Sequence, residues 1–292
     1  MHRTWPESSQ QELLRAVFAS GSAGASAFEA WRCQIDMADH PDVGSFRLLP
    51  ALSRRLVADR RDDPLVSKLQ GIARRNWFQN QRYFRSWAPV LESLYELGTP
   101  CMLIGGPSLA LRLNDYALLT ETILTILVRS NQACQAIERL QAIGWRSKKR
   151  LPPLTESYVT TSRMLGFRDE VGREIRLHWH LLSASRSTGS DWWDHAVPVC
   201  VHNVPVWVLD SADQVLYSCA EDSLTPNRST FQRAVDVVLV IHGEAEIDWN
   251  RIIWQAKKRS VILPLLAVMR YIQSVLDDSI PAPIWEQLQS LG

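Results

Sequence analysis

The chain has 292 residues, 46% of them hydrophobic, which is enough to bury a large core in one elaborated domain or two packed ones. Its 32 basic and 31 acidic side chains leave a net charge of +1, so there is no strong nucleic-acid or membrane signal in the overall charge. The five cysteines are scattered without a Cys-x-x-Cys pair, and we find neither a signal peptide nor an apolar run of transmembrane length. We therefore expect a cytoplasmic protein with reduced thiols.

The N-terminal region, residues 1–97, is expected to be helical because apolar residues recur at helical spacing and turn clusters are rare. The predicted helices cover residues 10–18, 25–37, 44–59 and 65–97. Most of the 12 tryptophans stand at positions that share the helical spacing of the apolar residues, so we expect them to be buried. Examples are Trp77, Trp87, Trp249 and Trp254. A stacking platform of Trp192, Trp193 and Trp207 is the alternative.

The most informative stretch begins with the short apolar run Cys101 to Ile104, which predicts a buried strand. Gly105 and Gly106 then allow a sharp turn close to a ligand, and Pro107 suits the first turn of a helix. Such a turn aims free amide groups at its guest, which is most often a phosphate. A second buried strand is predicted over residues 122–128.

The remainder of the middle region, residues 98–210, is expected to be mixed. Ser130 is predicted to cap a helix that ends at Gly144. Residues 145–150 are predicted to form an exposed strand or loop. Further strands are predicted over residues 155–163, 165–168, 174–180, 199–201 and 206–209, the last two as a hairpin that turns around Asn203 to Pro205. The C-terminal region, residues 211–292, is expected to be helical over residues 212–223, 229–242, 248–258, 261–276 and 282–291.

This order of motifs resembles the DNA polymerase β-like nucleotidyltransferase superfamily, and within it a bacterial family of uncharacterised nucleotidyltransferases. The segments that carry the resemblance are Ser45–Pro50, the glycine turn, the strand ending at Val128, Leu177–Trp179, Arg233–Asp236 and Ile247–Trp249. The resemblance implies an α+β fold, in which a nucleotidyltransferase-like mixed β-sheet core lies between a helical N-terminal region and a C-terminal helical bundle. It also suggests a bacterial accessory protein of natural-product biosynthesis or polysaccharide gene clusters.

The chain departs from the superfamily where the catalytic metal is bound. The resemblance places Ile123 and Thr125 at the two positions of the Asp-x-Asp motif, and Arg176 at the position of the third carboxylate. None of these side chains can bind Mg²⁺ as a carboxylate does, and two-metal phosphoryl transfer depends on such ligands. We therefore expect no metal at these degenerate positions.

Two nearby acids offer a relocated catalytic site. Glu121 is in phase with Ile123 and Thr125, and Glu174 lies on the same strand face as Arg176. A site built from Glu121 and Glu174 would need Mg²⁺ and a nucleoside triphosphate as cofactors. We favour the other interpretation, in which Glu121 is a solvated acid and Glu174 pairs with Arg173, Arg176 or a neighbouring strand.

Several residues are candidates for binding a substrate or phosphate around the former catalytic cleft. They are Gly105, Gly106, Ser108, Arg112, Arg129, Arg176, His178 and His180. His178 and His180 share a strand face and form a His-x-His pair, but a zinc site needs further ligands. We expect Trp179 to pack in the core and the two histidines to lie on the other face, near the cleft.

Three functions agree with these observations. The preferred one is a pseudoenzyme, in which the nucleotidyltransferase fold binds a partner protein, peptide or small ligand. The second is an active transferase that moves a nucleoside monophosphate to a small molecule, peptide or protein with relocated acids. The third is a nucleotide sensor in which Arg176 neutralises phosphate without a metal.

Overall fold

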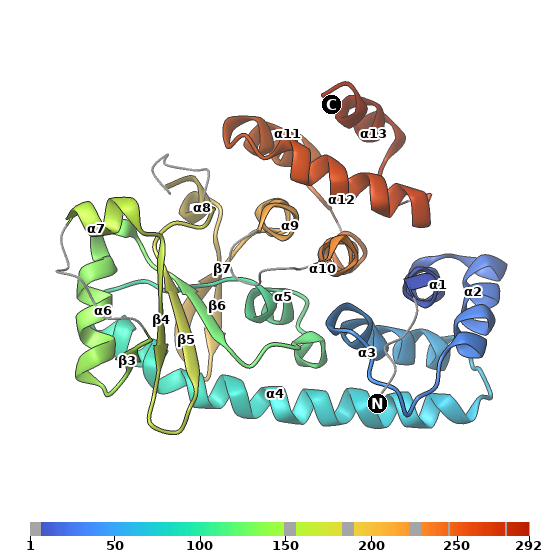
Figure 1. Cartoon of the computed structure of the whole chain (residues 1–292), viewed down its shortest axis with the longest axis horizontal. Coiled ribbons are helices and arrows are strands. Elements are labelled where there is room, and N and C mark those ends of the chain that lie inside the picture. The colour runs from blue at the N-terminus through green and yellow to red at the C-terminus, as the bar shows by residue number, and fades with distance from the viewer. Residues whose placement is uncertain are drawn as a thin grey trace.

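The computed structural model describes residues 7–148, 156–182, 190–221, 229–244, 246–277 and 279–291. Within these ranges the protein has a mixed α+β fold, with helices at both ends of the chain around a seven-stranded sheet (Figure 1). No helix in the described ranges is long and apolar enough to cross a lipid bilayer.

The sheet has the strand order β3-β4-β5-β2-β1-β7-β6. Its strands are β1 (Met102–Leu103), β2 (Leu124–Leu127), β3 (Arg146–Ser147), β4 (Met164–Arg168), β5 (Glu174–His178), β6 (Val197–Val201) and β7 (Val204–Val208). The central strand β2 runs parallel to β5 and antiparallel to β1, so the sheet is mixed as expected. All four residues of β2 are buried, which agrees with its central position.

The helices surround this sheet. They are α1 (Glu7–Phe18), α2 (Gly21–Gln34), α3 (Val43–Ala58), α4 (Pro64–Glu96), α5 (Gly106–Arg112), α6 (Ala133–Ala142), α7 (Glu156–Thr161), α8 (Ser190–Asp194), α9 (Ser211–Ala220), α10 (Thr230–Gly243), α11 (Trp249–Lys258), α12 (Ile262–Val275) and α13 (Ala282–Gln289). Short 3₁₀ turns lie at Tyr116–Leu118 and Ser130–Gln132.

The 33-residue helix α4 connects the two halves of the molecule. It begins where the Asp63 carboxylate accepts a hydrogen bond from the Leu65 amide and Pro64 fills the first turn. Its N-terminal part packs on α3, while its C-terminal part lies beneath the sheet, and its remaining side is free of other helices (Figure 1).

Two hydrophobic clusters form the core. One contains the sheet face that α4 and α6 cover, with Trp87, Ile126 and Ile137 among its members. The other combines side chains from the N-terminal and C-terminal helices, including Trp31, Leu52 and Val237. The N-terminal and C-terminal helical regions, predicted as separate segments, therefore share one hydrophobic core.

Some expected elements are wrong. Residues 156–161, expected to form part of a strand, form α7, in which the Thr161 hydroxyl donates to the Ser157 carbonyl at 2.8 Å. Ser130 does not cap α6, because that helix begins three residues later at Ala133 with Gln132 at its N-cap. The hairpin turns at His202 and Asn203, both with positive φ, rather than around Asn203 to Pro205.

The burial expected for the tryptophans is correct for Trp87, which is 2% exposed, but wrong for two others. Trp77 is 50% exposed and Trp254 is 53% exposed. Apolar spacing along a helix indicates burial only where another element covers that face, and the faces that carry Trp77 and Trp254 are open. The predicted platform is also divided, because Trp192 is buried whereas Trp193 and Trp207 meet edge to face at 6.3 Å.

Candidate functional site

The glycine turn lies at the end of β1 as predicted. Gly105 has a φ of 69°, a conformation that favours glycine, and Gly106 begins α5 with Pro107 in its first turn. The Ile104 amide donates to the Thr125 carbonyl at 3.2 Å, which holds the turn beside β2. A Cβ on Gly106 would overlap the Glu121 carboxylate, so a side chain at this position fits only if Glu121 moves aside.

Two of the positions that the resemblance assigns to metal ligands lie on the adjacent strand pair. Thr125 on β2 and Arg176 on β5 are direct Cα partners in the parallel register. Their side chains lie on the sheet face opposite α4, because Leu124, Ile126 and Leu177 fill the other face. The structure therefore brings together two of the three positions assigned to the former metal ligands, and Ile123 precedes β2 immediately.

The side chains at these positions do not fit a magnesium ion. Thr125 is 7% exposed and offers a neutral hydroxyl, and Arg176 contributes a guanidinium that repels a cation. Within the described ranges there is no group of three or more His, Cys, Asp or Glu side chains that would hold a metal. Arg176 makes no hydrogen bond or ion pair with any described residue, so its charge is open to an anion.

Glu121 belongs to a charged cluster rather than to solvent. Its Oε1 accepts from Arg47 Nη2 at 2.8 Å, and Arg47 also forms a buried ion pair with Asp236 and a 2.7 Å hydrogen bond to Thr120 Oγ1. The Arg47 and Asp236 side chains are 2% and 4% exposed, whereas that of Glu121 is 37% exposed. This Arg47 cluster, defined as Arg47, Thr120, Glu121 and Asp236, joins α3 and α10 to the segment that leads into β2.

Glu174 forms ion pairs with two cations, one on β4 and one just after β3. Its two carboxylate oxygens meet Lys148 and Arg168, each at 2.5 Å, and hydrogen bonds from these cations hold its pKa below the usual value. The prediction that Glu174 pairs with a neighbouring strand is confirmed. Glu121 and Glu174 are therefore each paired with their own cations, and they do not form one acidic pair.

The histidines separate in space. His178 is 1% exposed, and burial first and then the charges of Arg163 and Arg176 lower its pKa to about 3. Its imidazole is therefore neutral at physiological pH. His180 instead meets the Val159 carbonyl at 3.2 Å, on the side where Trp179 packs. The expectation that both histidines face the cleft together is wrong, because the strand ends at His178 and the chain turns after it.

The remaining phosphate-binding candidates are spread out. Arg112 lies at the far end of α5, where it pairs with Glu244 at 2.8 Å and donates to the Leu209 carbonyl and the Ser211 hydroxyl. Arg129 stacks over the Trp193 ring at 4.8 Å, and the Ser108 hydroxyl is fully buried. Gly105, Gly106, Arg176 and the neighbouring Glu121 are thus the candidate residues that lie around the turn itself.

Sequence reasoning missed the structural role of Arg47 and Asp236. Each is the one charged residue in an apolar stretch of helix, Phe46–Ala51 and Ala234–Ile241, and such an isolated charge needs a buried partner. This signal was present in two of the segments that carry the family resemblance, but it does not say which opposite charge is the partner.

The comparison with protein families agrees with this architecture. The model described as uncharacterised nucleotidyltransferase matches residues 31–277, so the chain belongs to that family. The match confirms the resemblance noted in the sequence, and it includes the glycine turn, the Arg47 cluster and the β2–β5 strand pair.

Two solved structures are similar in fold to part of the chain. One is the lincosamide antibiotic adenylyltransferase LnuA bound to lincomycin, with 13% identity, a TM-score of 0.37, and coverage of 53% of this chain and 94% of LnuA. The other is the antibiotic-resistance factor ANT(2'')-Ia, with 12% identity, a TM-score of 0.38, and coverage of 64% of this chain and 91% of that one. The comparison with curated proteins gives no match.

Proposed function

We propose that this member of the nucleotidyltransferase family is a pseudoenzyme that binds a ligand or partner in the former catalytic cleft and does not transfer nucleotides. The observation that supports the proposal is the register pair of Thr125 and Arg176, because the family resemblance assigns these two positions to metal-binding carboxylates and they carry a hydroxyl and a guanidinium instead. Without hard anionic ligands the protein lacks the means to position Mg²⁺ and to neutralise charge during phosphoryl transfer.

The charge at this position favours an anionic ligand. The Arg176 guanidinium is partly exposed, has no described partner and lies beside a neutral His178, so it keeps its full charge for a phosphate or carboxylate. A planar guanidinium can form two parallel hydrogen bonds with such a group. A nucleotide held in this way would bind without magnesium.

The alternative is an active transferase with Glu121 and Glu174 as relocated metal ligands. Their contacts do not favour it, because Arg47 already holds Glu121, while Lys148 and Arg168 hold Glu174. Both sets of ion pairs would have to break before the carboxylates could share a metal ion. This cost argues for binding over transfer.

Calorimetric titration with ATP, GTP, CTP and UTP, with and without Mg²⁺, tests the proposal. We expect that any nucleotide that binds does so equally in EDTA, and that Arg176→Ala weakens this binding about tenfold or more. Arg146→Ala is the matched control, because Arg146 lies on β3 with 82% of its side chain exposed. A requirement for Mg²⁺, together with transfer lost in Glu121→Gln or Glu174→Gln, would establish the active enzyme instead.

A further inference from the structure

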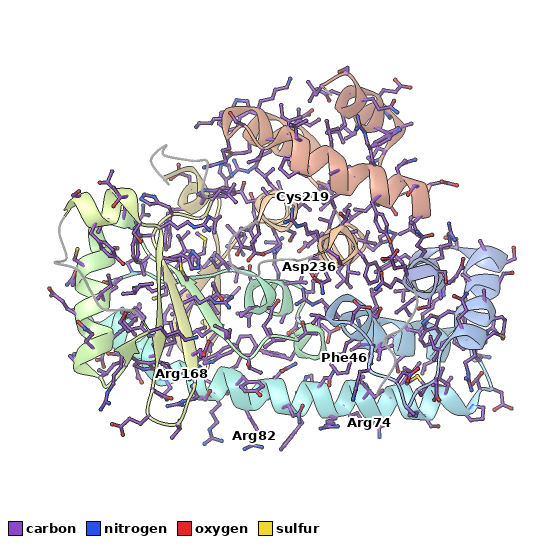
Figure 2. The ribbon with its side chains drawn as sticks, viewed as in Figure 1. Phe46, Arg74, Arg82, Arg168, Cys219 and Asp236 are labelled. Carbon is purple, nitrogen blue, oxygen red and sulfur yellow. The ribbon has the colours of Figure 1, made fainter. Side chains whose placement is uncertain are left out.

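The central part of α4 carries an unusual charge pattern for a chain of nearly neutral overall charge. Residues 64–91 contain no acidic side chain, yet they contain Lys68, Arg74, Arg75, Arg82 and Arg85, all exposed. None of these five makes an ion pair with a described residue. Figure 2 shows Arg74 and Arg82 on the side of α4 that faces away from the rest of the molecule. This surface is therefore cationic and uncompensated.

A groove runs along α4 beside these cations. It consists of three adjoining hollows of about 480, 300 and 230 Å³, and Tyr83 lines all three. Among the side chains that α4 contributes, Arg75, Gln79, Arg82, Tyr83 and Ser86 recur at helical spacing. Arg74 and Arg85 lie on the neighbouring stripe of the helix and do not line these hollows.

The opposite wall adds no free negative charge to the middle of the groove. It comes from Thr122 and Ile123 before β2 and from Arg173 in the β4–β5 turn, whose guanidinium donates to the Ser86 carbonyl at 3.4 Å. The two carboxylates at the ends of the groove, Glu121 and Glu174, are both paired with cations. The groove therefore presents a positive field to a bound molecule.

A buried amide indicates what kind of molecule fits. Asn76 lines the groove, is 6% exposed, and its Nδ2 has no hydrogen-bond partner among the described residues. One turn later Asn80 uses the same group to donate to the Tyr116 and Leu119 carbonyls at 2.6 and 2.8 Å. An unpaired buried amide is costly, and a peptide carbonyl is its natural acceptor.

We propose that the groove along α4 binds an extended, acidic segment of a partner protein. From Ile72 to Ser86 the helix rises about 21 Å at 1.5 Å per residue, which an extended peptide of roughly six residues would span. Arg75 and Arg82 would pair with its acidic side chains, and Asn76 would bind a carbonyl of its backbone after its Nδ2, which is buried in the free protein, turns toward the groove. The groove is lined by Ile123 and Glu121 but not by Arg176, Gly105 or Gly106, so this inference can be tested separately from the Arg176 site.

Fluorescence anisotropy with a labelled peptide rich in glutamate and leucine tests the inference on the full chain. We expect saturable binding that weakens with added salt, and no binding of the matched peptide with glutamine in place of glutamate. Arg82→Glu should weaken binding about tenfold or more, because it places like charges together in the groove. Asn76→Ala should weaken it as well, without removing its salt dependence. Absence of saturable binding would overturn the proposal.

Arg74→Glu is the matched control, since it makes the same charge change on the same helix outside the groove. It should change the affinity less than about twofold, because a rim charge mainly affects the association rate. Equal weakening by Arg74→Glu and Arg82→Glu would mean non-specific attraction and would contradict a defined groove. Thermal unfolding of each variant confirms that these exposed substitutions leave the fold intact.

Two further outcomes separate the alternatives. A single-stranded oligonucleotide that binds more tightly than the peptide, with the same dependence on Arg82, would identify a nucleic-acid-binding surface. That result would overturn the proposal that the groove binds an acidic protein segment. Arg176→Ala should leave peptide binding unchanged, so failure here and failure of the nucleotide titration can be told apart. Loss of peptide binding in Arg176→Ala would contradict a groove that Arg176 does not line.

Discussion

Arg47 on α3 and Asp236 on α10 form a buried ion pair between segments 189 positions apart in the chain. Both residues belong to motifs that carry the family resemblance, Ser45–Pro50 and Arg233–Asp236. Figure 2 labels Asp236 on α10 and Phe46 beside Arg47 on α3, which shows how the N-terminal and C-terminal helices meet at this point. The motif order thus has a physical reason, because these segments build one junction next to the glycine turn.

Breaking this pair should be strongly destabilising. Asp236→Asn leaves the buried Arg47 charge with Glu121 as its remaining carboxylate partner, and we expect a loss of about 3–5 kcal/mol in the free energy of unfolding. The double variant Arg47→Leu with Asp236→Leu should recover part of the lost free energy of unfolding, since neither charge of the pair then remains buried. Urea unfolding measures both, and equal stability of Asp236→Asn and the parent chain would contradict the role assigned to the pair.

The glycine turn and Glu121 should be energetically coupled. A side chain at position 106 would displace the Glu121 carboxylate and crowd Leu119 Cδ1 at 3.1 Å, so Gly106→Ala should cost about 1–3 kcal/mol. In a Glu121→Ala background the same change should cost clearly less. A double-mutant cycle by chemical unfolding gives the coupling, and strictly additive effects would show that the carboxylate does not lie over Gly106 in solution.

Restoring the carboxylates should restore metal binding if the assigned positions are correct. The triple variant Ile123→Asp, Thr125→Asp, Arg176→Asp should bind Mn²⁺ in a saturable manner, measured by the loss of free Mn²⁺ signal in electron paramagnetic resonance. The single variant Thr125→Asp should not, because Arg176 lies beside it in the register and would pair with the new carboxylate. A folded triple variant without Mn²⁺ binding would show that these are not the former ligand positions.

His178 should make stability depend on pH. Its pKa is lowered to about 3 by burial first and then by Arg163, whereas an unfolded histidine titrates near 6.5, so between these values the unfolded state binds the extra proton. Stability should therefore fall as pH drops below about 6.5, by up to about 1.4 kcal/mol per pH unit from this group. His178→Gln should remove this contribution.

The measurement is the difference between the two stability curves from pH 5 to pH 7, obtained by urea unfolding at each pH. The difference is needed because Asp213 acts in the opposite direction: burial, then Asp210, raises its pKa to about 7, so its contribution is lost as pH rises through that value. Both proteins contain Asp213, and its effect cancels. Parallel curves would contradict the burial of His178.

Many elements of the fold follow from local patterns. The Cys101–Ile104 run, the glycine pair and Pro107 predicted the strand, turn and helix correctly, and the spacing of apolar residues predicted the long helix now seen as Pro64–Glu96. Residues 156–161 were misassigned because β-branched and aromatic residues there favour a strand in isolation, while the local hydrogen bonds of α7 decide otherwise.

The site was predictable in part. The family resemblance assigned Thr125 and Arg176 to two metal-ligand positions on different strands. The β2–β5 register shows that these two residues lie side by side. The pairing of Glu121 with Arg47 was not predictable, because no local pattern specifies which of 31 acidic residues meets a given arginine. The exposure of Trp77 was missed for a similar reason, since helical phase does not reveal whether a neighbour covers the helix.

The sequence by itself determined which chemical groups the protein has: glycines at the turn, no carboxylate at positions 123, 125 and 176, and an acid-free basic stretch in α4. Only the tertiary structure decided how these groups are used, because charge pairing and burial depend on contacts between distant segments. It tied Glu121 and Glu174 to separate cations, left Arg176 without a described partner, and left one side of α4 uncovered by the other described helices.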